Sequence, residues 1–575
     1  MPVHNSDIAA VFDEMADLLE IRGDNPFRIR AYRNASRIIG DSGRELRDLV
    51  AANEDLTAIA GIGADLSKKI IEIVNTGKSE ALDTLRKEFP DGITELLRIP
   101  GLGPKRVKVL WKDLGIESMA KLEQAAKNGK IRGIAGFGEK IEQNILHSIQ
   151  AKQVEGKRFL RAAIAPSAEA LRSFVEAMPG AKQVTLCGSY RRGRETVGDL
   201  DILAVANDAT GIMDRFVKYD EVTKVLAKGD TKSSVILRSG IQADLRVVPA
   251  ESFGAALQYF TGSQGHNVAT RAIAQKLGLK LNEYGLTKGD EVVAGKTEKD
   301  IYKALGLDLI PPELREGRGE IEAATAGKIP KLIELGDLKG DLHNHSTWSD
   351  GANTIEEMAA AAKARGFEYL AITDHSKRLT VANGLDEKRL LKQIDEIDEL
   401  SAKLKGIALL KGIEVDILDD GALDLSDDVL KRLDVVVGSV HSRFNLSHEK
   451  QTERVLRAMD NPYFTILGHP TGRLLLERPA FEVDVPKIIA HASKRGCFLE
   501  LNANPHRLDL HDVHCKMARE AGVLISIDCD AHSTKDFENQ IHGIVQARRG
   551  WLEKGDVLNT RSLAQLRSLL KKSRG

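Results

Sequence analysis

Cysteine is scarce in this sequence, with four residues among 575 (Cys187, Cys497, Cys515 and Cys529) and no pair separated by two residues. A disulfide framework needs many cysteines and a cysteine-ligated zinc module needs closely spaced ones, so neither is expected, and the few scattered thiols fit a reducing cytosol. Long apolar runs are also absent, since none approaches the ~20 residues that span a bilayer. The N-terminal segment lacks the apolar core of a signal peptide. We therefore expect a cytoplasmic protein without a membrane anchor.

Net charge is nearly absent too, because 83 Lys and Arg side chains are balanced by 84 Asp and Glu side chains, for a formal charge of −1. Over the whole chain, this balance excludes a protein that wraps nucleic acid by general positive charge. Residues 101–160, however, carry 12 basic and 6 acidic side chains, so the neutral total conceals a basic segment suited to phosphates. Histidine is uneven as well: 12 of the 15 follow residue 340, which indicates a metal site there.

Hydrophobic periodicity predicts a multidomain protein. Apolar residues three to four apart indicate helices through residues 1–160, whereas short apolar runs indicate strands at 161–250 and alternating strands and helices after 341. A Pro- and Glu-rich stretch before 341 is typical of a linker. We expect an all-α domain at 1–85, an all-α subdomain at 86–160, an α+β domain at 161–250, helices with short strands at 251–325, a linker at 326–340, and a βα barrel or open α/β sheet at 341–575.

One glycine turn occurs three times in the helical region: Ile59-Ala-Gly-Ile-Gly63, Ile99-Pro-Gly-Leu-Gly103 and Ile134-Ala-Gly-Phe-Gly138. Two glycines two residues apart permit a tight turn and leave backbone N–H groups at the start of the next helix, where they bind phosphate irrespective of base sequence. A single copy would indicate only a helical corner, but three copies form the helix-hairpin-helix pattern. The predicted DNA-binding residues of these turns are Gly61, Gly63, Gly101, Gly103, Lys105, Gly136 and Gly138.

Paired carboxylates mark the predicted α+β domain. Asp199 and Asp201 are two apart on a predicted strand, so both point to one face, and Asp244 on a neighbouring strand completes a candidate triad. Clustered oxygen ligands of this kind suit Mg²⁺ ions that bridge a nucleophile and a triphosphate. Just upstream, the segment from Gly188 to Gly193, GSYRRG, supplies a small turn, a hydroxyl and two guanidinium groups to hold phosphates.

The histidine-rich region places metal-binding residue types at the carboxyl ends of predicted strands, where βα barrels carry their chemistry. Nine side chains are predicted as ligands: His343, His345, Asp350, His375, Glu414, His441, His469, Asp530 and His532. Mixed imidazoles and carboxylates suit two or three Mn²⁺, Zn²⁺ or Fe²⁺ ions with open positions to activate water.

Residues 1 to about 325 resemble DNA polymerase family X, which includes DNA polymerase beta, most closely in GSYRRGRETVGDLDIL, YFTGSQGHN and LNEYGL. The resemblance implies that Asp199, Asp201 and Asp244 hold Mg²⁺ or Mn²⁺ and that Asp244 activates the primer 3′-hydroxyl. It makes 161–250 a nucleotidyltransferase palm and 251–325 a thumb-like nucleotide-selection subdomain. The implied nucleotide contacts are Gly188, Ser189, Arg192, Gly198, Tyr259, Phe260, Gly262 and Asn267, with Arg271 on the template side.

Two further features follow from resemblance. Lys69 stands where the family has its Schiff-base lysine for sugar-phosphate removal, although Asp65 departs from the family pattern because a second phosphate-binding lysine is often found there. Residues 341–575 resemble the polymerase-and-histidinol-phosphatase (PHP) domain, which implies a distorted seven-stranded βα barrel with metal-dependent phosphoesterase chemistry.

This combination is the architecture of bacterial and archaeal family X members. We expect a monomeric, nucleoid-associated, template-directed DNA polymerase that takes deoxynucleoside triphosphates and gapped or primer-template DNA and fills short gaps in base excision repair. The barrel is expected to be a Mn²⁺-dependent 3′→5′ exonuclease. Two alternatives stay open: a nucleotidyltransferase joined to a small-molecule phosphatase, and a DNA-end-binding protein whose catalytic sites have decayed.

Overall fold

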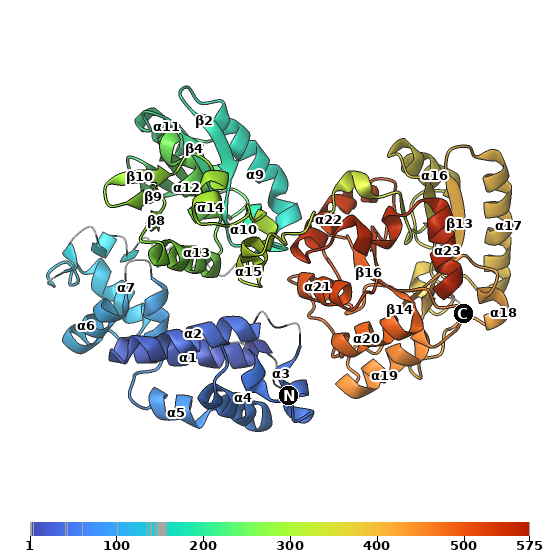
Figure 1. Ribbon diagram of the computed structural model, residues 1–575, viewed down its shortest axis with the longest axis horizontal. Coiled ribbons are helices and arrows are strands. Elements are labelled where there is room, and N and C mark those ends of the chain that lie inside the picture. The colour runs from blue at the N-terminus through green and yellow to red at the C-terminus, as the bar shows by residue number, and fades with distance from the viewer. Residues whose placement is uncertain are drawn as a thin grey trace. The chain divides into compact units, whose positions relative to one another are not determined.

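The computed structural model describes residues 3, 5–40, 42, 44–59, 61–99, 102–134, 136–138, 141–143, 145–146 and 158–573. Figure 1 shows the ribbon coloured along the chain. Contacts within the chain divide it into two compact units, the first Met1–Lys157 with Lys224–Ala227 and the second Arg158–Thr223 with Lys228–Gly575. No helix among the described residues is long and apolar enough to cross a membrane.

The N-terminal unit is built from helices around one apolar core. Phe12 and Tyr32 are buried there, their ring centroids 5.6 Å apart in an edge-to-face pair that joins the first two helices. Serine side chains cap two of the later helices, Ser79 through Leu82 N–H and Ser118 through Lys121 N–H. The helices with printed bounds are α1 (Asn5–Arg22), α2 (Pro26–Gly40), α3 (Leu46–Ala51), α4 (Ala64–Thr76), α5 (Glu80–Arg86), α6 (Pro104–Leu114) and α7 (Met119–Lys127).

A five-stranded sheet forms the first half of the central region, which we define as residues 158–325. The strand order is β2-β4-β7-β6-β5, in which β4 and β7 are parallel, whereas β2–β4 and β6–β7 are antiparallel. Val175, Phe216 and Leu245 share the core beneath this sheet. The elements are β1 (Phe159–Leu160), α9 (Arg161–Glu176), β2 (Lys182–Leu186), α10 (Gly188–Arg191), β3 (Thr196–Val197), β4 (Asp199–Val205), α11 (Thr210–Phe216), β5 (Val222–Lys228), β6 (Lys232–Leu237) and β7 (Gln242–Val248).

The second half of the central region is helical, with a small antiparallel sheet of order β10-β9-β8. Its core contains Leu286, Ile301 and Tyr302, and barrel residue Trp551 belongs to the same cluster. The elements are α12 (Phe253–Thr261), α13 (Gln264–Lys276), β8 (Lys280–Asn282), β9 (Gly285–Lys288), β10 (Glu291–Ala294), α14 (Glu298–Ala304) and α15 (Glu320–Thr325).

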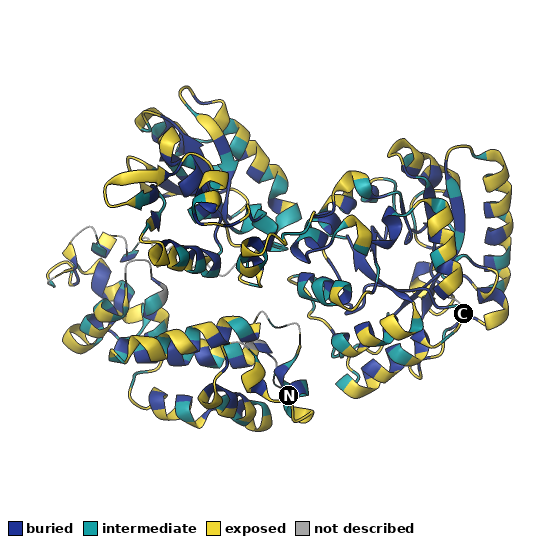
Figure 2. Ribbon diagram, in the orientation of Figure 1, coloured by how far each residue is buried: buried dark blue, intermediate teal, exposed yellow. Residues whose placement is uncertain are grey.

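Seven parallel strands form the C-terminal domain in the order β11-β12-β13-β14-β15-β16-β17. A parallel bridge between Asn344 and Ala531 brings the first strand beside the last, so the sheet is nearly closed into a barrel. The strands are buried and the outer helical faces exposed (Figure 2). The elements are β11 (Gly340–Asp341), α16 (Ile355–Ala364), β12 (Tyr369–Ile372), α17 (Glu387–Lys403), β13 (Ala408–Asp416), α18 (Asp427–Leu430), β14 (Val435–Ser439), α19 (His448–Met459), β15 (Ile466–Leu467), α20 (Val485–Arg495), β16 (Phe498–Asn502), α21 (Asp512–Glu520), β17 (Ile525–Asp528), α22 (Gln540–Arg549) and α23 (Leu563–Ser573).

The expected fold class is confirmed: helical N-terminal region, α+β central region and seven-stranded barrel. The segment expected as a linker, residues 326–340, is packed rather than loose. Ile333 is buried and donates its N–H to the Leu552 carbonyl at 3.0 Å, and Leu332 forms a bridge with Glu553. The central region and the barrel therefore belong to one unit.

Candidate active sites

Two parallel strands bring the predicted carboxylates together. Period-two alternation places Asp199 and Asp201 on one face of β4, and the β4–β7 register sets Asp201 directly opposite Asp244. Gln242 donates from Nε2 to Asp244 Oδ1 at 3.0 Å. Lys232 Nζ lies 3.0 Å from Asp244 Oδ2. Two neighbours thus orient the third carboxylate of the triad.

The triad carries excess negative charge. Burial raises the pKa of Asp201 to about 7, and the carboxylates of Asp199 and Asp244 add to the rise. Burial, followed by Asp244, also raises the pKa of Asp199. Among the described residues, the oxygens of these three carboxylates do not all come within 4.8 Å of one another. A divalent cation offsets the repulsion between neighbouring ionised carboxylates. The oxygen donors of the triad therefore fit Mg²⁺ or Mn²⁺.

The turn after β2 approaches the triad so closely that only glycine fits at its start. Gly188 has a φ of +57°, and a Cβ there would lie 2.3 Å from Asp201 Oδ2. Ser189 follows in α10, and Gly198 directly precedes β4. The predicted phosphate-binding residues therefore border the carboxylates.

Arg192, predicted to contact the triphosphate, is held by the protein in this structure. Its Nη1 donates to the Thr261 carbonyl at 2.6 Å, and its Nε donates to Glu316 Oε1 at 3.1 Å. The neighbouring Arg191 pairs instead with Glu298 through two hydrogen bonds of 2.9 and 2.7 Å. Both guanidinium groups of GSYRRG thus tie the two halves of the central region together, Arg191 through Glu298 and Arg192 through Thr261 and Glu316.

The predicted sugar and base contacts lie at the α12–α13 corner. Tyr259 and Phe260 form an edge-to-face pair with centroids 5.1 Å apart, and Gly262 follows α12 with a φ of +70°. The Asn267 amide is occupied within the protein, because Nδ2 donates to the Tyr259 carbonyl at 2.7 Å and Oδ1 accepts from Gln258 at 2.9 Å. In its present position Asn267 joins the two helices, and its contact with a base stays a prediction.

Arg271, predicted on the template side, lies one turn further along α13. Its Nε donates to the Asn267 carbonyl at 3.1 Å. This bond holds the guanidinium group of Arg271 against its own helix.

Glycine turns precede the helices of the N-terminal unit as predicted from the sequence. Gly63 and Gly103 stand directly before α4 and α6, and Gly61 has a φ of +95° with Ile38 Cδ1 2.5 Å from the site of a Cβ. Lys105 lies in the first turn of α6, beside Gly103 in a groove of about 730 Å³. These turns leave helix N-termini open to phosphate.

The third glycine turn is described in part. Gly136 and Gly138 both have positive φ, +86° and +56°. Gly101 of the second turn lies outside the described residues.

Lys69 lines a cavity of about 530 Å³ together with Arg22, Arg28 and Lys68. Its ammonium lies 2.5 Å from Asp65 Oδ1, one helical turn away on α4. An ammonium paired with a carboxylate donates a hydrogen bond and lacks the free electron pair that attacks a sugar aldehyde. The Schiff-base role of Lys69 therefore stays a prediction.

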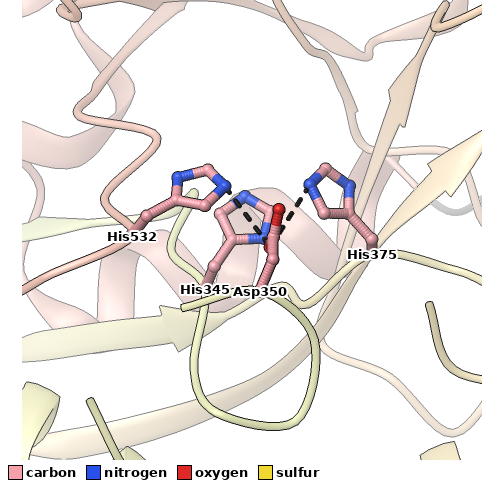
Figure 3. A group of neighbouring side chains, drawn as sticks. All are labelled: His345, Asp350, His375 and His532. Atoms are coloured by element: carbon pink, nitrogen blue, oxygen red, sulfur yellow. Dashed lines mark ion pairs between the residues drawn. The ribbon is translucent and has the colours of Figure 1, made fainter. Parts of the chain in front are cut away.

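One group of predicted ligands surrounds Asp350 at the barrel (Figure 3). Asp350 Oδ1 lies 3.4 Å from His532 Nε2, 3.7 Å from His375 Nε2 and 3.9 Å from His345 Nδ1. One ligand atom of each residue lies within 4.8 Å of all the others. Loops after three different strands, β11, β12 and β17, supply the group.

Glu414, near the end of β13, connects the remaining ligands. Its Oε2 lies 2.7 Å from His375 Nδ1 and 3.3 Å from His343 Nε2. Its Oε1 lies 2.9 Å from His469 Nε2 and 3.2 Å from His441 Nε2. Asp530 completes the set, because its Oδ1 lies 3.1 Å from His345 Nε2. The fold brings all nine predicted side chains into one network.

The donor set fits a metal centre. His343 Nε2 and Glu414 Oε2 are buried and lie 3.3 Å apart, but neither atom makes a hydrogen bond of acceptable geometry. Burial alone would raise the pKa of Glu414, but His375 and His343 hold it well below its usual range. Burial lowers the pKa of His345 to about 3, with His532 and His375 adding to the effect, so this imidazole is in its neutral, metal-binding form. Burial opposes protonation of His343, His441 and His532 as well, but the neighbouring carboxylates outweigh it and raise the pKa of His343 well above its usual value, that of His441 to about 10 and that of His532 to about 9. Without a metal these three imidazoles are protonated beside the carboxylates, and a divalent cation would take the place of their protons. Mixed imidazole and carboxylate donors suit Mn²⁺, Zn²⁺ or Fe²⁺.

Glu500 is a functional candidate that sequence reasoning missed. His343 Nδ1 lies 2.6 Å from its Oε1, and His469 N–H donates to its Oε2 at 2.5 Å, so it orients two predicted ligands. The only signal in the sequence was a carboxylate inside the apolar run CFLELNA. Asp416 acts similarly on His441, with Oδ1 2.9 Å from its Nδ1.

Known families match the chain in five consecutive segments. In chain order, the descriptions are helix-hairpin-helix domain at residues 3–79, SAM-like helix-hairpin-helix tandem at 93–151, DNA polymerase beta palm at 158–245, DNA polymerase beta thumb at 256–316 and PHP domain at 341–504.

Similar proteins cover the chain to different extents. "DNA polymerase/3'-5' exonuclease PolX" of Bacillus subtilis (strain 168) is 40% identical over 581 aligned residues, covering 99% of this chain and all of the relative. A "Probable phosphatase" of Thermoanaerobacter sp. (strain X514) is 31% identical over 41% of this chain and 95% of its own length. "DNA polymerase lambda" of Rattus norvegicus is 26% identical over 54% of this chain and 56% of its own length.

Proposed function

The chain belongs to the family X DNA polymerases that carry a C-terminal PHP domain, and from that premise we propose that it combines two activities. The central region adds deoxynucleotides to a primer under the direction of a template and fills short gaps in DNA repair. The barrel removes nucleotides from a DNA 3′ end. One observation carries the proposal: a single chain holds both an aspartate triad on paired strands and nine converging strand-end ligands.

For synthesis, Asp199, Asp201 and Asp244 would hold Mg²⁺ or Mn²⁺. Such ions neutralise the triphosphate and make the attacking hydroxyl more acidic. We assign Asp244 to the primer 3′-hydroxyl, because Gln242 and Lys232 already orient its carboxylate.

The nucleotide site would lie beside this triad. The turn after β2 supports a phosphate role, since Gly188 lets the backbone approach Asp201. We assign triphosphate contacts to Gly188, Ser189, Arg192 and Gly198, sugar contacts to Tyr259, Phe260 and Gly262, and a base contact to Asn267.

For hydrolysis, the nine barrel ligands would hold two or three Mn²⁺, Zn²⁺ or Fe²⁺ ions. Such ions supply Lewis acidity for cleaving a phosphodiester. His343 Nε2 and Glu414 Oε2, buried beside each other without a hydrogen bond, support this assignment. Glu500 and Asp416, which contact the ligands His343 and His441 from behind, support it too.

Gapped or primer-template DNA would bind along the helical glycine turns. Gly61, Gly63, Gly103, Lys105, Gly136 and Gly138 would contact its phosphates, Gly101 would take the same role, and Arg271 would contact the template strand. The four cysteines are free and buried, which suits the reducing cytoplasm. We propose that the chain works there as a monomer at the nucleoid.

Extension and shortening of one labelled primer on gapped DNA, first with Mg²⁺ and then with Mn²⁺, test both activities together. Replacing Asp199 and Asp201 by Ala should abolish extension and spare shortening. His343→Ala should cut shortening by about 10²-fold or more and spare extension. Loss of both activities in either variant, with circular dichroism unchanged, would refute the two-site assignment.

A second function for the barrel has one specific observation in its favour, the similarity to the probable phosphatase that covers 41% of this chain. Release of phosphate from a small phosphomonoester, together with an unshortened DNA primer, would select the phosphatase. The reverse result would select the exonuclease.

A further inference from the structure

A barrel helix is seated on the turn predicted to bind the triphosphate. Helix α22 lies so close that a Cβ at Gly193 would be 2.4 Å from Val545 Cγ1. At the end of α22, Arg549 Nη1 donates to the Arg192 carbonyl at 2.8 Å. The side chain of Arg549 is 2% exposed. The turn that carries Arg192 is therefore braced by the barrel and not only by its own domain.

The same two arginines share one carboxylate. Glu316 Oε1 accepts from Arg192 Nε at 3.1 Å and from Arg549 Nη1 at 2.9 Å. Arg549 Nη2 lies 2.7 Å from Asp512 Oδ2, which also lies 3.0 Å from Arg318 Nη1. Positive and negative charges thus alternate along a largely buried series of side chains that begins at Arg192 in the central region and enters the barrel at Arg549.

This arrangement sets how firmly Glu316 holds Arg192. A carboxylate oxygen divided between two guanidinium groups binds each more weakly than it would bind one alone. When Arg192 turns from Glu316 to another anion, Arg549 remains as the partner of Glu316. The Glu316 carboxylate therefore keeps a cationic partner. Without Arg549, the free-energy cost of leaving this carboxylate unpaired would oppose the movement of Arg192.

We propose that Arg549 is a positioning residue of the polymerase site: by sharing Glu316, it frees Arg192 to bind the triphosphate of the incoming deoxynucleotide. The inference rests on the proposed function, since it takes Arg192 as a triphosphate contact. The barrel then has a role in synthesis that is separate from its own hydrolytic site. Neither Asp199, Asp201 nor Asp244 contacts this chain of charges, so the role concerns nucleotide binding and not the metal site.

Steady-state kinetics of the full chain on one-nucleotide-gapped DNA with Mg²⁺ test the proposal. Arg549→Met should raise the KM for the deoxynucleotide about tenfold and leave kcat close to the wild-type value. In this variant Glu316 is no longer shared with Arg549 and binds Arg192 more strongly. Arg549→Lys should give an intermediate KM, since one ammonium cannot reach Glu316, Asp512 and the Arg192 carbonyl together.

Arg548→Met is the matched control, from the same helix and the same interface. Arg548 pairs with Glu313 and donates to the Ile333 carbonyl, and neither contact involves Arg192. Its KM should equal that of the wild type. An equal rise in KM for Arg548→Met and Arg549→Met would indicate a loosened interface and overturn the proposal.

A Glu316→Gln background isolates the postulated competition. There Arg549→Met should change the KM by less than about twofold, because the competing carboxylate is gone. A full tenfold rise in that background would overturn the proposal. If Arg549→Met fails to fold, Arg549→Lys carries the test, and a wild-type KM in it would be a refutation.

A wild-type chain that extends no primer refutes the proposed function and this inference with it. A wild-type chain that extends primers, with Arg549→Met at the wild-type KM, refutes this inference alone. Mn²⁺-dependent primer shortening, measured on every variant, reports that the barrel is intact.

Discussion

Asp201 lies directly opposite Asp244 across the parallel strands β4 and β7. Burial and the two neighbouring carboxylates raise the pKa of Asp201 to about 7. The metal-free polymerase site thus holds a proton near neutral pH, and a divalent cation would release it.

Asp201 should make the stability of the metal-free protein depend on pH. Its folded-state pKa of about 7 lies above the ordinary value of 3.8, so the folded chain binds a proton that the unfolded chain has lost. The free energy of unfolding should therefore fall as pH rises from about 4 through about 7. Asp201→Asn should remove this fall and be more stable than the wild type at pH 8 by about 1–3 kcal/mol.

Thermal unfolding in EDTA between pH 5 and pH 8 provides the measurement. Asp220→Asn, at an exposed position of the same domain, is the control and should follow the wild type. A constant difference between Asp201→Asn and the wild type across this range would contradict the expectation.

Gly188 should be indispensable for synthesis. Gly188→Ala places a Cβ 2.3 Å from Asp201 Oδ2 at a φ of +57°, so either the turn or the carboxylate must move. We expect primer extension to fall by about 10²-fold, since small displacements of reacting groups have effects of that size. Shortening by the barrel should persist.

Gly180→Ala is the control for the strain that a positive φ imposes on any residue other than glycine. Gly180 has a φ of +85° and nothing within 4 Å of the site of a Cβ. Gly180→Ala therefore carries the backbone strain of the left-handed region, about 1–2 kcal/mol, but adds no contact with the triad. Equal extension by the two variants would show that the approach to Asp201 is unimportant.

Glu500 should support hydrolysis through His343 and His469. Glu500→Gln removes the charge behind two predicted ligands, so metal affinity and primer shortening should fall about 10–100-fold. Extension should be unaffected. Glu453→Gln, an exposed change on α19, is the control, and a variant of Glu500 that shortens primers as fast as that control would exclude the role.

Lys69 should form a Schiff base only in the fraction of molecules in which its ion pair with Asp65 is broken. Borohydride trapping on DNA with a 5′ sugar phosphate should give a covalent adduct that Lys69→Ala lacks. Asp65→Asn should raise the yield about twofold, because it removes the carboxylate 2.5 Å from the Lys69 ammonium. An adduct of wild-type yield in Lys69→Ala would assign the chemistry to another amine.

Much of both sites followed from local sequence pattern. Period-two spacing predicted that Asp199 and Asp201 share a face, because side-chain alternation is a property of the single strand. Strand-end position predicted the nine barrel ligands, because parallel strands all present their carboxyl ends at one edge. Gly63 and Gly103 were predictable as the residues that open α4 and α6, since only the local turn is involved.

Other features depended on partners far apart in the chain. Closure of the barrel rests on the bridge between Asn344 and Ala531, which no local pattern distinguishes from an open sheet. Glu500, on β16, supports His343, which lies 157 residues earlier after β11, because the barrel fold brings these two side chains together.

The sequence by itself therefore determined which residue types and spacings could bind metals and phosphates, because periodicity and turn chemistry are local. The tertiary structure decided what those residues contact. GSYRRG contains two arginines, either of which could bind a phosphate as far as the local sequence shows. In the folded chain Arg191 is hydrogen-bonded to Glu298 and Arg192 to Glu316. Its link to Arg549, 357 residues later, exists only because α22 folds back onto that turn.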